Sequence, residues 1–250
     1  MIRYHGTPIT PDAAAVQILK GRHGLVSFER PDQIGLVAEM CQSFALDNGA
    51  FSHWRAGKGE VDCEAYAGWV RDWSRHPGFD WCLIPDVIDG SEQDNQRLVE
   101  CWMQQNAGIE SVPVWHLHES LDWLAKLAQM FRRVALGSSG DYSQPGSELW
   151  EERMNEAMEV ICDGQGRPQV KVHGLRMMDP TLFSRYPFAS VDSCNVARNI
   201  GLDSSWDGFK YGTALRKSVR GVVMAQHCED HASATVWRKN RREQYRLLFG

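Results

Sequence analysis

The amino-acid sequence predicts an α/β protein built as a single (β/α)8 barrel, also called a TIM barrel. Short apolar runs alternate with segments of helical period along most of the chain. This alternation is typical of a parallel sheet with helical connections. Eight such runs within 250 residues favour a closed barrel, which typically takes about 250 residues. No glycine-rich dinucleotide or P-loop fingerprint supports an open doubly wound sheet instead.

The strands are expected where short apolar runs are bounded by polar residues or glycine. The expected ranges are 24–28, 43–46, 81–84, 112–116, 133–136, 169–172, 189–191 and 221–225. Between them, apolar residues recur at helical spacing. The clearest helical stripe joins Leu121, Leu124, Leu127 and Phe131, and further stripes begin at Ile34, Tyr66, Leu98 and Met154.

The composition indicates a globular protein of a reducing compartment. Hydrophobic residues make up 43% of the chain and charged residues 24%, which is ordinary for a soluble domain. No apolar run approaches the ~20 residues that span a bilayer. The seven cysteines are scattered and odd in number, which favours free thiols over a disulfide framework. Because the N-terminus has no apolar secretion signal, we expect a cytoplasmic protein.

The net charge of −5 conceals a basic C-terminal end, since residues 216–250 contain eight Lys or Arg against three acidic residues. The densest run includes Arg238, Lys239, Arg241 and Arg242. A basic end on an acidic body suggests an anionic partner, here nucleic acid. The alternative is a solvated terminal helix. With no linker or repeat, residues 1–250 are expected to form one domain with a basic helical end at about 232–250.

Polar residues follow most of the expected strands, and in a barrel such residues line the mouth where active sites lie. They are Asp47, Asn48, Asp86, His116, His118, Gly137, Ser138, Ser139, His173 and Asp192. A purely structural barrel would not need three carboxylates there. Each carboxylate also has a structural alternative, because Asp192 fits a helix N-cap and Asp47 and Asp86 fit turns.

Four segments, in order along the chain, resemble motifs of the tRNA-guanine transglycosylase family. They are residues 46–51 (LDNGAF), 84–88 (IPDVI), 135–141 (ALGSSGD) and 172–201. The first three are similar to the family's Thr-Asp-Ser/Gly-Gly-Phe-Gln, Phe-Asp-Glu and Gly-Gly-Leu-x-Val-Gly-Glu elements. The last is similar to a Met-Gly-Val-Gly-x-Pro strand followed by Phe-Asp-Cys and an Arg-Asn tail.

The resemblance implies a base-exchanging glycosyltransferase that replaces guanine in a nucleic acid with a 7-deazaguanine. In that reaction Asp192 would be the nucleophile of a covalent Asp–sugar intermediate. Asp47 would be the general acid and base, and Asp86 would read the purine. The remaining substrate contacts would come from His116, Gly137, Ser138, His173 and Arg198. The resemblance implies no cofactor.

The chain departs from the tRNA enzymes in two respects. It lacks their Cys-x-Cys-x-x-Cys zinc-binding subdomain, and it is much shorter. Both departures favour the short phage and bacterial relatives that act on guanine in DNA, so DNA is expected over tRNA as the partner. The target base would then be flipped out of the duplex, because C1′ cannot be reached in a stacked nucleotide.

Three other functions are compatible with the same residues. A metal-dependent barrel hydrolase is the first, because His116 and His118 lie at i and i+2 on one side of a strand, and His173 and Asp192 complete a ligand set. The second is a catalytically inactive, nucleic-acid-binding relative, which would bind with a steep salt dependence. The third is a small-molecule nucleosidase, which would not need the basic end.

Overall fold

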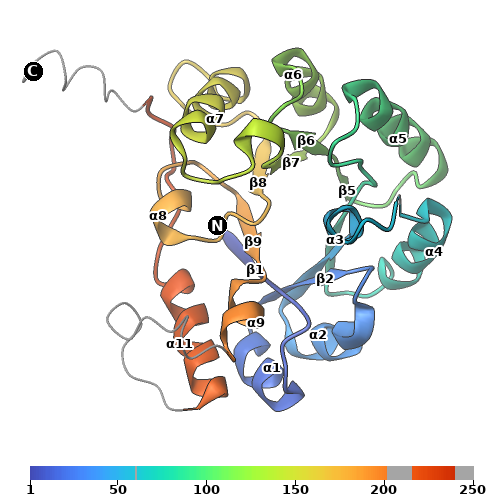
Figure 1. The fold of residues 1–250 in the computed structure, drawn as a ribbon, viewed down its shortest axis with the longest axis vertical. Helices are drawn as coiled ribbons and strands as arrows, with labels where there is room; N and C mark the ends of the chain where they lie inside the picture. The colour runs from blue at the N-terminus through green and yellow to red at the C-terminus, as the bar shows by residue number, and fades with distance from the viewer. Residues whose placement is uncertain (60, 202–215, 240–250) are drawn as a thin grey trace, which may run out of the picture.

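A computed structural model describes residues 1–59, 61–201 and 216–239 and shows one parallel sheet curled into a barrel (Figure 1). The strands are β1 (Ile2–Gly6), β2 (His23–Ser27), β3 (Ser43–Asp47), β4 (Phe79–Leu83), β5 (Ser111–Val112), β6 (Val114–His116), β7 (Arg133–Gly137), β8 (Lys171–Gly174) and β9 (Ser190–Ser193). Their order in the sheet is β5-β4-β3-β2-β1-β9-β8-β7-β6, and every pairing is parallel. The predicted (β/α)8 barrel is confirmed.

The barrel closes at Pro113, which separates β5 from β6. On one side β5 pairs with β4, and on the other β6 pairs with β7. Proline has no N–H and cannot donate to a ladder, but its carbonyl still accepts from Ala135 N at 2.9 Å. Strands β5 and β6 are therefore the two halves of one staggered barrel strand, and the nine strands fill eight positions.

Seven of the eight predicted strands coincide with or overlap barrel strands, and the eighth is wrong. Residues 221–225 are helical, within α11 (Lys217–Glu229). Their run Gly-Val-Val-Met-Ala is too short for periodicity to separate a strand from a buried helix. The missing strand is β1, whose outward positions Arg3 and His5 interrupt the apolar pattern. Both residues point to Glu229 of α11 (Arg3 at 3.2 Å, His5 at 3.1 Å), which accounts for their polarity.

Helices surround the barrel in an outer ring, with short helices near the strand ends (Figure 1). They are α1 (Asp12–Leu19), α2 (Ile34–Met40), α3 (Ala50–Ala56), α4 (Cys63–Trp73), α5 (Glu92–Gln105), α6 (Leu121–Met130), α7 (Glu148–Ile161), α8 (Pro180–Phe183), α9 (Asn195–Asn199) and α11. The predicted helical stripes lie on α2, α4, α5, α6 and α7. Helix α3 lies inside the ring of the longer helices (Figure 1).

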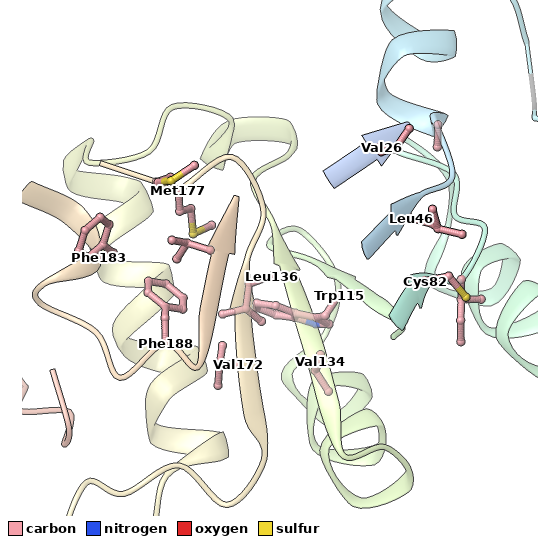
Figure 2. Packing of buried hydrophobic residues seen from close by; sticks show 14 of the residues in the cluster. Val26, Leu46, Cys82, Trp115, Val134, Leu136, Val172, Met177, Phe183 and Phe188 are labelled. Carbon is pink, nitrogen blue, oxygen red and sulfur yellow. The ribbon is translucent and has the colours of Figure 1, made fainter. Parts of the chain in front are cut away.

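Two hydrophobic cores follow from the alternation of side chains along the strands. The outward positions pack under the helices, and Figure 2 shows part of this core, including Val26, Leu46, Trp115, Val134, Leu136 and Val172. The inward positions form a separate cluster of Tyr4, Leu25, Ala45, Trp81, Leu83, Val112, Val114 and Ala135. The barrel is thus a packed core with polar residues only toward its ends.

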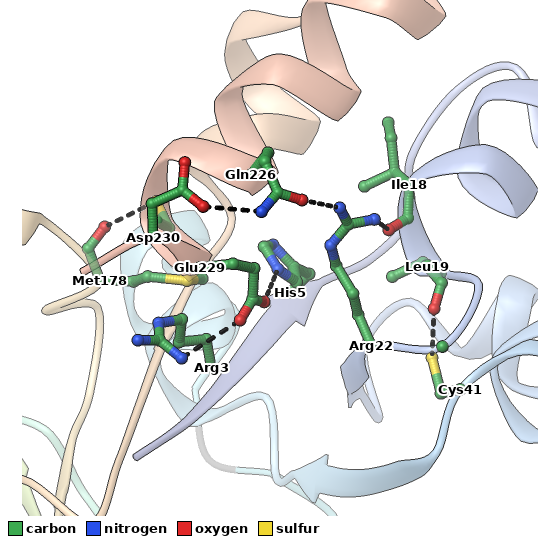
Figure 3. A network of polar contacts seen from close by, with 12 residues as sticks. Arg3, His5, Ile18, Leu19, Arg22, Cys41, Met178, Gln226, Glu229 and Asp230 are labelled. Atoms are coloured by element: carbon green, nitrogen blue, oxygen red, sulfur yellow. Dashed lines mark hydrogen bonds and ion pairs between the residues drawn. The ribbon is translucent and has the colours of Figure 1, made fainter. Parts of the chain in front are cut away.

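Helix α11 joins the two ends of the fold through a polar network (Figure 3). Glu229 accepts from Arg3 and His5 of β1, and Gln226 accepts from Arg22 Nη2 at 3.0 Å. Gly221 permits the close packing, because a Cβ there would lie 2.4 Å from Ile18 Cδ1 of α1. Helix α11 therefore covers β1 where a barrel helix is expected.

Residues 231–239 leave α11 and run past α8 toward α7 (Figure 1). Ser233 Oγ donates to Phe188 O at 2.8 Å, and Trp237 N donates to Gly166 O at 2.7 Å. Both acceptors precede strands, so this segment crosses the amino ends of β8 and β9. The helical end predicted for about 232–250 is not helical over 232–239, and residues 240–250 lie outside the described part.

The predicted free thiols are confirmed, because none of the seven cysteines forms a disulfide. In the described ranges, no helix is long and apolar enough to cross a membrane.

The contact between Gly166 and Trp237 gives a test of how the C-terminal segment docks. Gly166 has φ +77°, and a Cβ there would lie 2.1 Å from Trp237 O, whereas one on Gly164, in the same loop, would meet nothing within 4 Å. We expect Gly166→Ala to lower the free energy of unfolding by roughly 1–3 kcal/mol. Gly164→Ala should change it little. Chemical denaturation and proteolysis after residue 231 measure both effects, and equal results for the two variants would contradict this docking.

Candidate active site

The carboxyl ends of the strands bring together most of the polar residues predicted from the sequence. Asp47 ends β3, His116 ends β6 and Gly137 ends β7. Asp192 lies in β9, and Asp86 follows β4 by three residues. Because the strands are parallel and closed into a barrel, these five positions surround one mouth.

Asp47 is a partly buried carboxyl group with a shifted pKa. Burial raises its pKa from 3.8 to about 6, against the opposing effects of the neighbouring Ser27 hydroxyl and the Gly49 backbone. The negative charges of Asp192 and Asp86 raise it further. A carboxyl group with a pKa near 6 exchanges protons readily close to neutral pH, which is the property of a general acid or base.

Asp86 is held in a fixed orientation by two donors from neighbouring strand ends. Asn48 Nδ2 donates to Asp86 Oδ1 at 2.7 Å, and the His116 Nε2 position lies 2.8 Å from Asp86 Oδ2. Asn48 is itself fixed, since its Oδ1 accepts from Ala50 N and its Nδ2 also donates to Ile84 O. The Asp-Asn-Gly turn therefore orients the carboxylate of the next strand.

His116 belongs to a buried polar chain behind the mouth. Burial opposes its charged form, but the hydrogen bond and charge of Asp86, with the charge of Glu119, raise its pKa overall. Glu119 Oε2 accepts from His116 N at 2.8 Å, and its Oε1 accepts from Asn95 Nδ2 at 2.8 Å. Asp86 thus orients the imidazole through Nε2, while Glu119 holds the backbone of His116.

Asp192 lies on the opposite side of the mouth with a different set of partners. Its Oδ1 accepts from Arg176 N at 2.9 Å and lies 3.2 Å from His173 Nε2. Burial lowers the pKa of His173, so the ring is neutral. Since an ionised carboxylate only accepts, Nε2 carries the proton and Nδ1 accepts from Ser190 Oγ at 2.9 Å. Two donors therefore fix the orientation of the Asp192 carboxyl group.

Arg176 reaches across the mouth from the loop after β8. Its backbone is left-handed, with φ +59°, which turns its N–H to Asp192. Its guanidinium lies 3.7 Å from the Phe51 ring centroid of α3, and Nη2 donates to Ser138 O at 3.1 Å. A cation is thus placed beside the carboxylates, a position from which it can bind an anionic group.

Three further residues were predicted to contact the substrate, namely Gly137, Ser138 and Arg198. A Cβ on Gly137 would lie 3.2 Å from His116 Nδ1, so glycine gives the imidazole its space. The Ser138 hydroxyl accepts from Trp150 Nε1 at 3.0 Å. Arg198 is exposed on α9, where its charge reaches Arg176 and Cys194.

Three contributors to the site had no assigned role in the sequence analysis: Arg176, Glu119 and the amide of Asn48. Arg176 follows a strand end directly, a signal that could have found it. Glu119 is three residues beyond its strand, and its partnership with His116 depends on a turn that periodicity does not show.

The metal-binding alternative gains no support from the arrangement of side chains. Over residues 1–59, 61–201 and 216–239, no three His, Cys, Asp or Glu side chains are placed to hold one ion. His116 pairs with Asp86, whereas His118 contacts Ser139 Oγ at 2.7 Å. The predicted pair thus turns to two different partners.

The basic run begins at the end of the barrel opposite the mouth. Lys239 pairs with Glu159 of α7, and Arg238 lines a hollow with Arg185 and Asn155. Arg241 and Arg242 lie outside the described residues. Binding of nucleic acid by this run stays a prediction.

Comparisons with known proteins show the fold. Neither a protein-family model nor a curated protein matches the chain. Among solved structures, a mutant tryptophan synthase α-subunit from Pyrococcus furiosus is 12% identical with a TM-score of 0.51, over 92% of this chain and 96% of that one. A structure of the tryptophan synthase α2β2 complex from the same organism is 13% identical with a TM-score of 0.51, over 92% of this chain and 97% of that one. A protein from Aquifex aeolicus is 12% identical with a TM-score of 0.50, over 95% of this chain and 93% of that one.

These comparisons correct the family assignment made from the sequence. The resemblance to tRNA-guanine transglycosylases is wrong, and so are the predicted base exchange and transglycosylase activity, because the similar barrels are tryptophan synthase α-subunits and no family model matches. The motifs misled because short elements with Asp or Gly after a strand suit any barrel mouth.

The pKa of Asp47 predicts how stability depends on pH. Below pH 3.8 this group is protonated in both the folded and the unfolded chain; above pH 6 it is ionised in both, and in the folded chain burial and the charges of Asp192 and Asp86 oppose that ionisation. Since each pKa unit corresponds to about 1.4 kcal/mol, Asp47→Asn should stabilise the fold by up to roughly 3 kcal/mol above pH 6. The gain should vanish toward pH 4. Denaturation across this pH range measures it, and Asp89→Asn, an exposed change on the loop after β4, is the control. A gain independent of pH would contradict the shift.

Proposed function

We propose that this protein is a lyase-type acid–base enzyme that acts on a small anionic substrate in the mouth of the barrel. The observation that carries the proposal is the pairing of unlike carboxyl groups. Asp47 has a pKa raised to about 6, while Asp192 is hydrogen-bonded by two donors as a carboxylate. Two carboxyl groups whose environments differ in this way are suited to separate acid and base roles.

In this proposal, each group of the mouth has one role in an elimination. Asp192 accepts a proton from the substrate, and the freed electron pair forms a new double bond as the bond to the leaving group breaks. Asp47 gives its proton to the leaving group. Exchange with solvent then returns the proton of Asp192 to water and restores that of Asp47. The two carboxyl groups act on opposite sides of one substrate, and no redox step is needed.

The pair of Asp86 and His116 supplies electrostatic stabilisation. The raised pKa of His116 favours a charged partner for Asp86, and the dipole of this pair can stabilise charge that develops on a substrate at the mouth. Asn48 and Glu119 hold this pair in place. A preorganised donor avoids reorientation during the reaction.

Arg176 accounts for the anionic substrate. Its guanidinium rests on the Phe51 ring, and Nη2 donates to the carbonyl of Ser138. The planar guanidinium can still bind a carboxylate or phosphate in a bidentate manner. The likeness to tryptophan synthase α-subunits supports a lyase-type reaction only as an analogy of fold.

We also propose that the protein works in a reducing compartment such as the cytoplasm. None of the seven cysteines forms a disulfide. Burial raises the thiol pKa of Cys41, Cys82 and Cys194 to about 12, which disfavours the reactive thiolate.

Exchange of substrate protons with deuterated water tests the proposal without knowledge of the full reaction. Proton NMR would follow a panel of small carboxylates and phosphate esters that carry a hydroxyl or carbonyl group. We expect the wild type to exchange or eliminate at least one of them. Asp47→Asn should slow this by about 100-fold or more, and the wild-type rate should change with an inflection near pH 6.

Asp89→Asn serves as the matched control, because it removes an exposed carboxylate from the same end of the barrel. It should react at the wild-type rate. The proposal fails if no compound reacts with the wild type, or if Asp47→Asn keeps full activity.

A further inference from the structure

A second polar cavity lies at the amino ends of the strands, on the opposite side of the barrel from the mouth. Its volume is about 730 Å³, within the range of small-molecule sites. Its charged lining residues are Asp80, Glu110, Arg132, Arg133 and Lys171. Ala234 and Thr235 of the C-terminal segment complete the wall, held by the contacts of Ser233 and Trp237 described above.

Arg133 is the most deeply placed charge of this cavity. It begins β7, points into the barrel and is only 8% exposed. Its guanidinium lies 5.3 Å from the Trp81 ring centroid, and Nη1 donates to Ser190 Oγ at a long 3.4 Å. Within the described part of the chain it forms no ion pair. A buried cation without an anionic partner is unfavourable, so an anion in the adjoining cavity would relieve it.

The charges around Arg133 favour an anion of low charge. Arg132 and Lys171 are exposed at the rim. Asp80 accepts a hydrogen bond from Tyr4 Oη, which occupies part of its carboxylate, and Glu110 is exposed. Three cations therefore face two carboxylates. This balance suits a single carboxylate or phosphate group better than a polyanion.

We propose that the amino-end cavity binds a small oxyanion, a compound with one carboxylate or phosphate group, with Arg133 at its base and Arg132 and Lys171 at its rim. This site is separate from the mouth and does not depend on the function proposed for it.

A chain of hydrogen bonds through the barrel connects this site with the mouth. Arg133 donates to Ser190, Ser190 donates to His173 Nδ1 at 2.9 Å, and His173 Nε2 donates to Asp192 at 3.2 Å. An anion that draws Arg133 away from Ser190 would change the hydrogen bonding of His173. Occupancy of the cavity is therefore sensed by a carboxylate at the other end of the barrel.

Calorimetric titration of the full-length protein with inorganic phosphate, and separately with malonate, tests the binding. We expect a Kd of about 1 mM or tighter for at least one anion. Lys171→Gln should weaken it several-fold and Arg133→Gln tenfold or more. Lys126→Gln, which removes an exposed lysine of α6, should not change it. The preferred anion identifies the ligand as a phosphate or a carboxylate compound.

Because Arg133→Gln can disturb the core, the exposed Lys171→Gln keeps the test decisive. The proposed site would be overturned if neither anion binds at a concentration about ten times the expected Kd. Equal affinity of the wild type and Lys171→Gln would overturn it as well.

Nitrogen NMR of the His173 ring tests the connection. Phosphate or malonate should shift the Nδ1 and Nε2 signals in the wild type. In Ser190→Ala the anion should still bind, but the shift should be lost. A shift of the same size in Ser190→Ala would overturn the connection. Neither readout uses substrate turnover, so failure here is distinguishable from failure of the proposed function.

Discussion

Closure of the sheet is the constraint on which the other features depend. Two very short strands on either side of Pro113 link β4 to β7, and once the barrel is closed, every inward side chain faces the same axis. Apolar residues fill the middle of this axis. Polar residues collect at both ends, with Asp47, Asp86, His116 and Asp192 at the mouth and Asp80 and Arg133 at the amino end. The hydrogen bonds of Ser190 and His173 connect Arg133 at the amino end with Asp192 at the mouth.

The mouth separates its carboxyl groups by environment, although all are aspartates. Asp192 and Asp86 each accept hydrogen bonds from two well-placed donors. Burial and the negative charges of Asp192 and Asp86 raise the pKa of Asp47. One of three aspartates thus has a raised pKa because of its surroundings alone. Burial of Asp47 lowers the stability of the fold above pH 6, a loss that is common at functional sites.

Much of the fold was predictable from the sequence, because periodicity and strand ends report local structure directly. Five helices and seven strands followed from apolar spacing, and the mouth residues followed from the rule that parallel strand ends meet. Strand β1 was missed because the polar residues Arg3 and His5 interrupt its apolar pattern. Both contact Glu229, which lies more than 200 residues away in the sequence. Glu119 was missed because its contact with His116 depends on a turn, whereas the position of Arg176 just after β8 was a signal that the sequence did offer. The family assignment failed because the motifs were short and matched the barrel mouth in general.

The position of β1 between β2 and β9 has a consequence for folding in the cell. Strand β1 is synthesised before the other barrel strands, but its partner β9 spans Ser190–Ser193. The barrel is therefore unable to close until most of the chain has been synthesised, and contacts of such large sequence separation slow folding. Until then β1 and the newest strand are open edges, which are sites of mispairing between nascent chains. Helix α11 comes after β9 in the sequence and packs against β1, so β9 completes the sheet and a helix synthesised later still shields its earliest strand.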